Sequence, residues 1–170
     1  INYSPQITEL NLFALPFFFA NEPNRYAALD AVTNGKSGQM VAAAVEKKCG
    51  KFITFGENGF RELTNTKKEI RTPDDIKGLK KRVVGSPLFI DIFKALGANP
   101  ITMAWSDTMS AIQQGVIDGQ ENPVLTYFPL KVLDYHKFVT NWHYTADPTM
   151  FVVNPGVWKS FSAADQELIT

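Results

Sequence analysis

Strands and helices alternate through short connections along residues 72–123 of this chain. Thr72 and Ser86 each precede a proline, a pair that is typical of a capped helix start, and Ser106 is expected to cap a third helix. Three short segments between and after these helices predict strands: "GLKKRVV", "ITMAW" and "GVIDG". Alternation of this kind predicts an α/β fold in which most strands pair in parallel.

The flanking sequence predicts further elements on both sides of this run. Helices are expected at residues 22–33, 37–48, 123–137 and 162–170, and strands at 51–56, 138–144 and 149–153. Residues 57–71 are polar and turn-rich, so we expect a loop with a short strand there. The stretch "DGQENP", residues 118–123, concentrates polar groups directly before a predicted helix. It either caps that helix or forms one wall of a ligand site.

Composition and charge argue against several classes of protein. The 170 residues include 17 basic and 17 acidic side chains, so charge gives no reason to expect nucleic acid as a partner. The most apolar run, residues 10–20, is too short to cross a membrane, contains Pro16 and lacks the features of a signal peptide. Cys49 is the only cysteine, and we expect it to be a half-buried structural residue beside Gly50. Because the chain opens abruptly and stops inside a predicted helix, we expect it to be a segment of a longer protein.

The sequence contains no recognisable motif for catalysis, phosphate binding or metal binding. His136 and His143 lie on different predicted elements, which gives no metal-ligand spacing. "NGKSG" lacks the first glycine of a phosphate loop, because that position is Asp30. Arg82 is the strongest candidate from the residues alone. It lies in an apolar strand, on the opposite face from Lys81, where it needs either a structural salt bridge or a ligand.

Two long segments, "TPDDIKGLKKRVVGSP" and "FKALGANPITMAWSDTMSAIQQGVIDGQENP", resemble the extracytoplasmic solute-binding proteins of TRAP transporters, the DctP-like family. The similarity continues through "LPFFFAN", "NGFRELTN" and "MFVVNPGVWKSFSAADQ", so it covers almost the whole chain. It implies a two-domain, class II-like periplasmic-binding-protein fold with a cleft between the domains, of which this chain is an incomplete segment. Residues 1–58 would belong to the first domain, 59–146 to the second, and 147–170 would return to the first.

The same resemblance implies the residues that bind the ligand. Arg82 matches the arginine that binds the ligand carboxylate, Asn122 the asparagine that orients it, and Arg61 a second arginine near the acid group. Trp105 stands where the family usually has an aromatic residue against the ligand. Lys81 replaces an apolar residue, so either its face of the strand is partly wet or its stem snorkels. No catalytic residue, metal or cofactor is expected.

The implied function is capture of an organic acid in the periplasm by domain closure, followed by delivery to the TRAP membrane permease for sodium-dependent uptake. A C4-dicarboxylate is the first expectation, because two arginines could bind two carboxylates. A sugar acid such as a uronate or sialate is the alternative. The protein is expected to be a monomer that does not insert into the membrane. Two other functions stay open: a ligand sensor, and an enzyme that uses Glu121 or Asp118 as a base.

Overall fold

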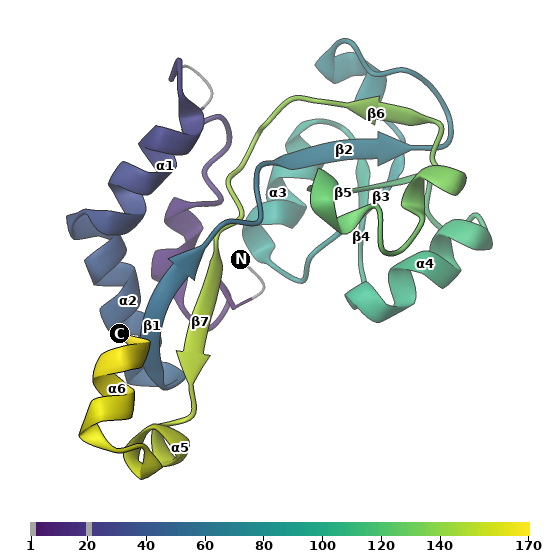
Figure 1. The fold of residues 1–170 in the computed structure, drawn as a ribbon. Helices are drawn as coiled ribbons and strands as arrows, with labels where there is room; N and C mark the ends of the chain where they lie inside the picture. The colour runs from purple at the N-terminus through teal and green to yellow at the C-terminus, as the bar shows by residue number, and fades with distance from the viewer. Residues whose placement is uncertain (1–2, 20–21) are drawn as a thin grey trace.

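The computed structural model describes residues 3–19 and 22–170, and Figure 1 shows them arranged as two lobes. The first lobe contains the elements α1 (Arg25–Asn34), α2 (Lys36–Lys48), β1 (Lys51–Gly56), β7 (Thr149–Val153), α5 (Pro155–Ser160) and α6 (Ala163–Ile169). The second lobe contains β2 (Arg61–Asn65), β3 (Lys80–Val83), α3 (Pro87–Ala95), β4 (Asn99–Thr102), α4 (Trp105–Gln113), β5 (Gly119–Pro123) and β6 (Phe138–Thr140). Short 3-10 helices lie at Thr8–Leu12, Pro73–Ile76, Val124–Thr126 and Val132–Asp134. The expected mixed α/β class is confirmed.

Within residues 22–170, the chain passes between the lobes twice, from β1 to β2 and from β6 to β7 (Figure 1). These two crossing segments run antiparallel beside each other. The N–H of Arg61 donates to the carbonyl of Thr145 at 3.0 Å, and the N–H of Asp147 donates to the carbonyl of Gly59 at 3.0 Å. The crossings therefore form a two-stranded connection between the lobes. The division into domains at residues 58 and 146 stays a prediction.

The second lobe is built on a five-stranded sheet with the order β4-β3-β5-β2-β6. Strand β3 pairs in parallel with β4 and β5, whereas β2 pairs antiparallel with β5 and β6. In the first lobe, β1 and β7 are also antiparallel. The expectation of mostly parallel pairing is therefore wrong. Only β3, β4 and β5 are joined by the helical crossovers that parallel neighbours require.

The stretch "DGQENP" forms a central strand and not a turn. Its residues 119–123 make up β5, every one of them is buried, and the strand pairs with β2 and β3. No α-helix begins at Pro123, because the segment after it forms only the two short 3-10 helices. Pro129 supplies the physical reason: it has no N–H to donate and restricts the residue before it. The polar side chains of β5 point into a hydrogen-bonded interior, which local sequence signals do not reveal.

Some of the predicted helix starts are correct and others are not. The carboxylate of Asp75 accepts from the N–H of Thr72 at 2.8 Å, as the capping pattern predicts. Ser86 does precede α3, but its hydroxyl accepts from Ser4 at 3.1 Å and does not cap the helix. Helix α4 starts at Trp105, one residue before the predicted cap Ser106, so Trp105 sits at a helix amino terminus and not in a strand.

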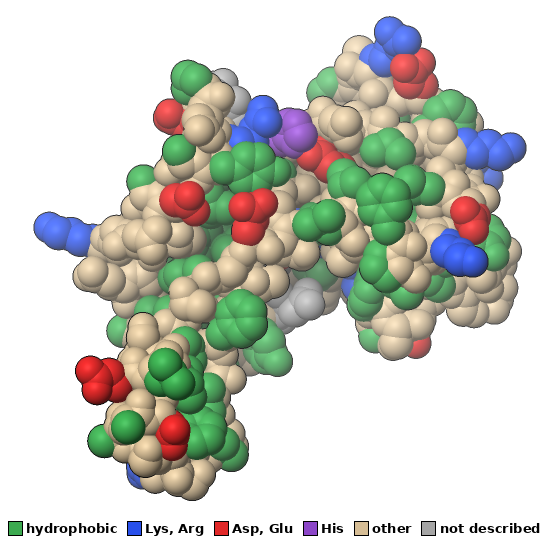
Figure 2. Space-filling model, viewed as in Figure 1, with side chains coloured by type: hydrophobic (Ala, Val, Ile, Leu, Met, Phe, Trp, Pro, Cys, Tyr) green, Lys and Arg blue, Asp and Glu red, His purple; other side chains and the backbone are tan. Residues whose placement is uncertain are grey.

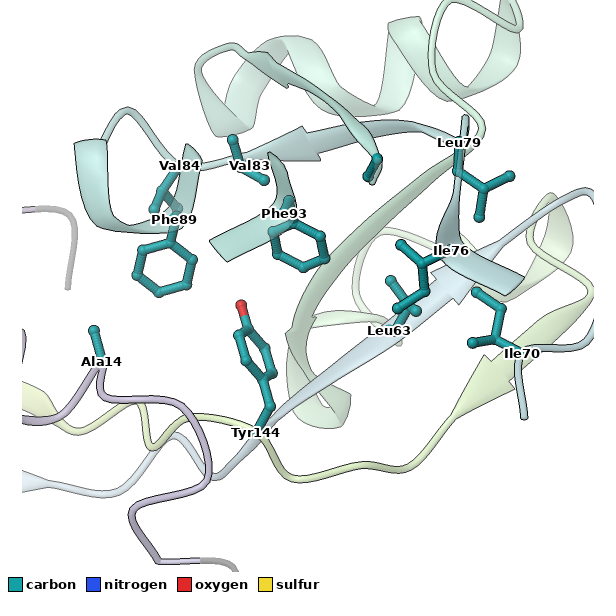
Figure 3. Close-up of a cluster of buried hydrophobic side chains, with 11 residues drawn as sticks. Ala14, Leu63, Ile70, Ile76, Leu79, Val83, Val84, Phe89, Phe93 and Tyr144 are labelled. Carbon is teal, nitrogen blue, oxygen red and sulfur yellow. The ribbon is translucent and has the colours of Figure 1, made fainter. Parts of the chain in front are cut away.

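Each lobe has its own hydrophobic core. In the second lobe, the aromatic residues Phe89, Phe93 and Tyr144 pack beside aliphatic side chains from the sheet (Figure 3). In the first lobe, the buried cluster consists of Ile7, Leu10, Phe13, Phe19, Leu29, Val41, Val45, Phe60 and Ala146. Cys49 is exposed, which corrects the expectation of a half-buried residue.

The surface carries mixed charges. On the face shown in Figure 2, acidic and basic side chains are scattered, and hydrophobic side chains gather over α5 and α6. No helix within the described residues has the length and apolar character needed to cross a membrane.

Candidate functional site

Two adjoining cavities lie where β3, β5, the start of α4 and the crossing segments meet. The first, of about 230 Å³, is lined by Arg82, Val84, Gly85, Ser86, Met103, Ala104 and Trp105. The second, of about 150 Å³, is lined by Asn58, Arg61, Arg82, Val84, Trp105, Asn122, Thr126 and Asp147. The second cavity therefore brings together all four of the residues that the resemblance implied as ligand-binding. It also contains Asn58, Thr126 and Asp147, which carried no signal in the sequence.

Arg82 is a nearly buried guanidinium that has no acidic partner in the part of the chain that the structure describes. Its side chain comes from β3, the residue is 4% exposed, and Nη2 donates to the carbonyl of Met103 at 3.0 Å. The guanidinium carbon lies 5.3 Å from the ring centre of Trp105, and Nε is buried with no hydrogen-bond partner. Among the described residues, no carboxylate oxygen lies within 4.0 Å of this side chain. Burial lowers the pKa of Arg82, and arginine keeps its positive charge in proteins.

Arg61 has the opposite environment, because it is saturated with acceptors. Its Nε donates to Oε2 of Glu121 at 2.5 Å, and its Nη1 donates to Oδ2 of Asp147 at 2.7 Å. Its Nη2 donates to Oε1 of Glu121 and Oδ1 of Asn122, each at 3.0 Å. Burial opposes the charge of Arg61, but the two ion pairs outweigh that effect and raise its pKa well above the ordinary value. Its charge is therefore already neutralised within the protein.

Asn122 lies at the end of a chain of buried polar side chains. Its Oδ1 accepts from Arg61, and its Nδ2 donates to Oε1 of Gln120 at 2.8 Å. The amide Nε2 of Gln120 donates to the hydroxyl of Thr64 at 2.7 Å, and that hydroxyl lies 2.8 Å from Nδ1 of His136. These contacts fix the orientation of the Asn122 amide and leave its second Nδ2 hydrogen without a partner among the described residues, and Asn122 lines the second cavity.

Lys81 lies on the other face of β3 and is completely buried. Its Nζ donates to the backbone carbonyls of Thr64 and Gln120, and it lies 5.7 Å from the ring centre of Phe93. Burial lowers the pKa of Lys81 well below its ordinary value. The expectation of a partly wet face or a snorkelling stem is therefore wrong, because backbone carbonyls satisfy the amine inside the lobe.

The acidic residues that an enzyme could use as a base are engaged in structural contacts. Glu121 is fully buried and holds both Arg61 and the hydroxyl of Tyr144. Asp118 accepts from the N–H of Lys80 at 2.9 Å and pairs with Lys67 at 3.4 Å. No group of three potential metal ligands occurs among residues 3–19 and 22–170. The geometry therefore suits the binding of an anion better than acid–base chemistry.

The family model of the bacterial extracellular solute-binding proteins, family 7 (DctP), matches residues 1–170. This chain belongs to that family. The family and the fold are those of transport solute-binding proteins, and the described architecture agrees with both.

Three similar proteins are each named for, or crystallised with, a different organic acid. The chain is 32% identical to the 2,3-diketo-L-gulonate-binding periplasmic protein YiaO of Escherichia coli, over 99% of this chain and 50% of that protein. It is also 32% identical to the C4-dicarboxylate-binding periplasmic protein DctP of Rhodobacter capsulatus, over 92% of this chain and 46% of that protein. A TRAP periplasmic solute-binding protein from Ralstonia eutropha is 51% identical with a TM-score of 0.90, and its crystal structure holds (S)-2-acetolactate. That match covers 99% of this chain and 53% of that structure, so the chain spans about half the length of its relatives.

Proposed function

We propose that this chain forms part of a periplasmic solute-binding protein that captures a small organic acid and delivers it to a TRAP membrane permease. The observation that carries this proposal is the environment of Arg82. A buried cation normally has an anionic partner, because an unpaired charge away from water is costly. Arg82 has none among the described residues, yet it lines two cavities. A ligand carboxylate would supply the missing anion.

The geometry around Arg82 suits a carboxylate. A guanidinium presents parallel N–H groups whose spacing matches the two oxygens of a carboxylate, and such pairs are charge-assisted. The Nε of Arg82 is a buried donor with no partner among residues 3–19 and 22–170. Trp105 lies against one face of the guanidinium and limits where the ligand can sit. The free N–H of Asn122 offers a further donor at the same cavity.

Transport fits the arrangement better than the other functions considered. Two antiparallel crossing segments join the lobes, so a change in the relative orientation of the lobes on ligand binding would bend these segments. Glu121 and Asp118 are held by other residues, which argues against a catalytic base. From its membership of this family we also infer that the protein is periplasmic, that its partner is the TRAP membrane permease and that uptake depends on sodium. A sensor would use the same site and would differ only in the protein that reads the closed state.

The test is a comparison of substitutions at two arginines in the full-length protein. In calorimetry against an organic-acid library, Arg82→Lys should lose affinity, because a point charge cannot reproduce the planar fork. Truncating one partner of a desolvated charge pair costs about 2–5 kcal/mol, so Arg82→Ala, which removes the charge as well, should lose at least about 30-fold. Arg71, which is exposed and paired with Glu69 at 2.9 Å, gives the matched control Arg71→Lys, which should bind as the wild type does. Wild-type affinity in Arg82→Lys would overturn the proposal.

A further inference from the structure

The two arginines that line the second cavity differ in their ionic partners. Two guanidinium groups line this cavity, those of Arg61 and Arg82. Two carboxylates contact Arg61, those of Glu121 and Asp147, whereas Arg82 has no carboxylate partner among the described residues. Arg82 is therefore the guanidinium with which a ligand carboxylate can pair. A second ligand carboxylate would find Arg61 already engaged by two carboxylates.

Asp147 gives the cavity an acceptor that a ligand can use. The residue is 9% exposed, and its Oδ2 takes both of its side-chain hydrogen bonds, from Arg61 at 2.7 Å and from Asn58 at 3.1 Å. Its Oδ1 accepts no hydrogen bond from any residue that the structure describes. An ionised carboxylate oxygen can only accept, so it favours a ligand group that donates.

Thr126 adds a second acceptor to the same wall. Its hydroxyl hydrogen is directed to the backbone carbonyl of Pro123, so toward a ligand the hydroxyl oxygen can only accept. The lining of the cavity thus includes donors, from Arg82 and Asn122, and acceptors, from Asp147 and Thr126. Because the cavity has a volume of only about 150 Å³, one small molecule can contact groups of both kinds.

We propose that Asp147 determines specificity: the site selects small monocarboxylic acids that carry a hydroxyl group near the carboxylate, and it disfavours dicarboxylates. The ligand carboxylate binds Arg82, and the ligand hydroxyl donates to Oδ1 of Asp147. A second carboxylate at the position of the hydroxyl would face Asp147 with like charge. This inference rests on the proposed function. A C4-dicarboxylate was expected on the assumption that Arg61 and Arg82 each bind one ligand carboxylate. In the structure, Arg61 is paired with Glu121 and Asp147 instead.

Three acids with four carbons each separate the effect of the ligand hydroxyl from the effect of a second ligand carboxylate. We would measure the affinity of the full-length protein for 2-hydroxybutanoate, for butanoate, which lacks the hydroxyl, and for succinate, which adds a carboxylate. A hydrogen bond to a charged group changes affinity by about 10- to 100-fold. We expect 2-hydroxybutanoate to bind more tightly than either of the other two by a factor in that range. This ranking needs no variant, so it does not depend on how a substitution folds.

The variant Asp147→Asn tests the residue itself. It keeps the size of the side chain and removes the negative charge, so affinity for 2-hydroxybutanoate should fall and affinity for succinate should rise. Asp118→Asn is the matched control, because Asp118 is also a buried carboxylate but lies in the second lobe, outside both cavities. The control should leave the ranking of the three acids unchanged.

The outcomes distinguish this inference from the proposed function. If succinate or butanoate binds as tightly as 2-hydroxybutanoate, and the binding is lost in Arg82→Lys, the role of Asp147 is refuted while the proposed function stands. If Asp147→Asn leaves the ranking unchanged, the role of Asp147 is likewise refuted. If no organic acid binds the full-length protein, both proposals are overturned.

Discussion

Replacing Asn122 by aspartate changes one functional group and very little volume. In the structure, Nδ2 of Asn122 donates to Gln120 at 2.8 Å, and Oδ1 accepts from Arg61 at 3.0 Å. Aspartate keeps the contact with Arg61 and strengthens it, but it loses the donor. The second N–H, which we assign to the ligand carboxylate, is lost at the same time. The substitution also places a negative charge at the cavity that receives a negative ligand.

The expected loss of affinity has two contributions. A hydrogen bond to a charged group contributes about 1.5–3 kcal/mol, and its removal alone weakens binding by about 10- to 100-fold. Two like charges about 4 Å apart repel by about 4 kcal/mol at an effective dielectric constant of about 20, and the nearby Arg61 offsets part of this. We therefore expect Asn122→Asp to weaken acid binding by at least about 100-fold at neutral pH.

The substitution Asn122→Asp should affect the stability of the ligand-free protein much less than it affects binding. Leaving the buried Oε1 of Gln120 without its donor costs about 1–3 kcal/mol, while the stronger contact with Arg61 offsets part of that cost. We expect scanning calorimetry without ligand to show a shift of only a few degrees in the melting temperature. Titration calorimetry should show the large loss of affinity for the acid. Asn99→Asp, at an exposed amide that donates to Gly78 at 3.2 Å, should change neither quantity appreciably. Wild-type affinity in Asn122→Asp would refute the role of this amide in binding.

Two further predictions concern Trp105 and His136. Ligand binding should change the intrinsic fluorescence of the protein, and Trp105→Phe should remove that change. The other two tryptophans, Trp142 and Trp158, pack against aromatic neighbours outside both cavities. A fluorescence change that survives in Trp105→Phe would exclude Trp105 from the site. Burial, aided by the charge of Lys81, lowers the pKa of His136 to about 4, so the folded protein resists protonation of His136 between that value and the ordinary 6.5 of the unfolded chain. The stability that neutral His136 contributes is complete above pH 6.5 and is lost as the pH falls toward 4, by about 3 kcal/mol at 1.36 kcal/mol per pH unit. Urea unfolding should show this loss in the free energy of unfolding. His136→Asn, which keeps an acceptor for Thr64, should lose less stability over the same pH interval. An equal loss in the variant would contradict the role given to His136.

Elements with local signals were predictable from the sequence. Gly50 follows α2, Pro87 begins α3 and Gly97 ends it, and each of these elements lies within a few residues of its predicted position. The signals work because they act on the backbone of the same few residues. Strand β5 has no such signal, since its polar residues are typical of turns and only the surrounding sheet satisfies them.

The candidate site was predictable only in part, for the same reason. The resemblance implied Arg61, Arg82, Trp105 and Asn122, and the structure places these side chains around one cavity. What the sequence could not show is how the two arginines differ. The carboxylates that neutralise Arg61 lie 60 and 86 residues away along the chain, so their approach depends on the complete fold.

The position of Asp147 connects ligand binding to the joint between the lobes. Its backbone N–H pairs with Gly59 of the other crossing, and its side chain is held by Asn58 and Arg61. Arg82, in contrast, belongs to the sheet of the second lobe. A ligand that contacts both Arg82 and Asp147 would therefore tie that sheet to both crossing segments at once. Because any rotation of the lobes must bend these crossings, a hydroxyl that fixes Asp147 would favour one orientation of the lobes more strongly than a carboxylate alone.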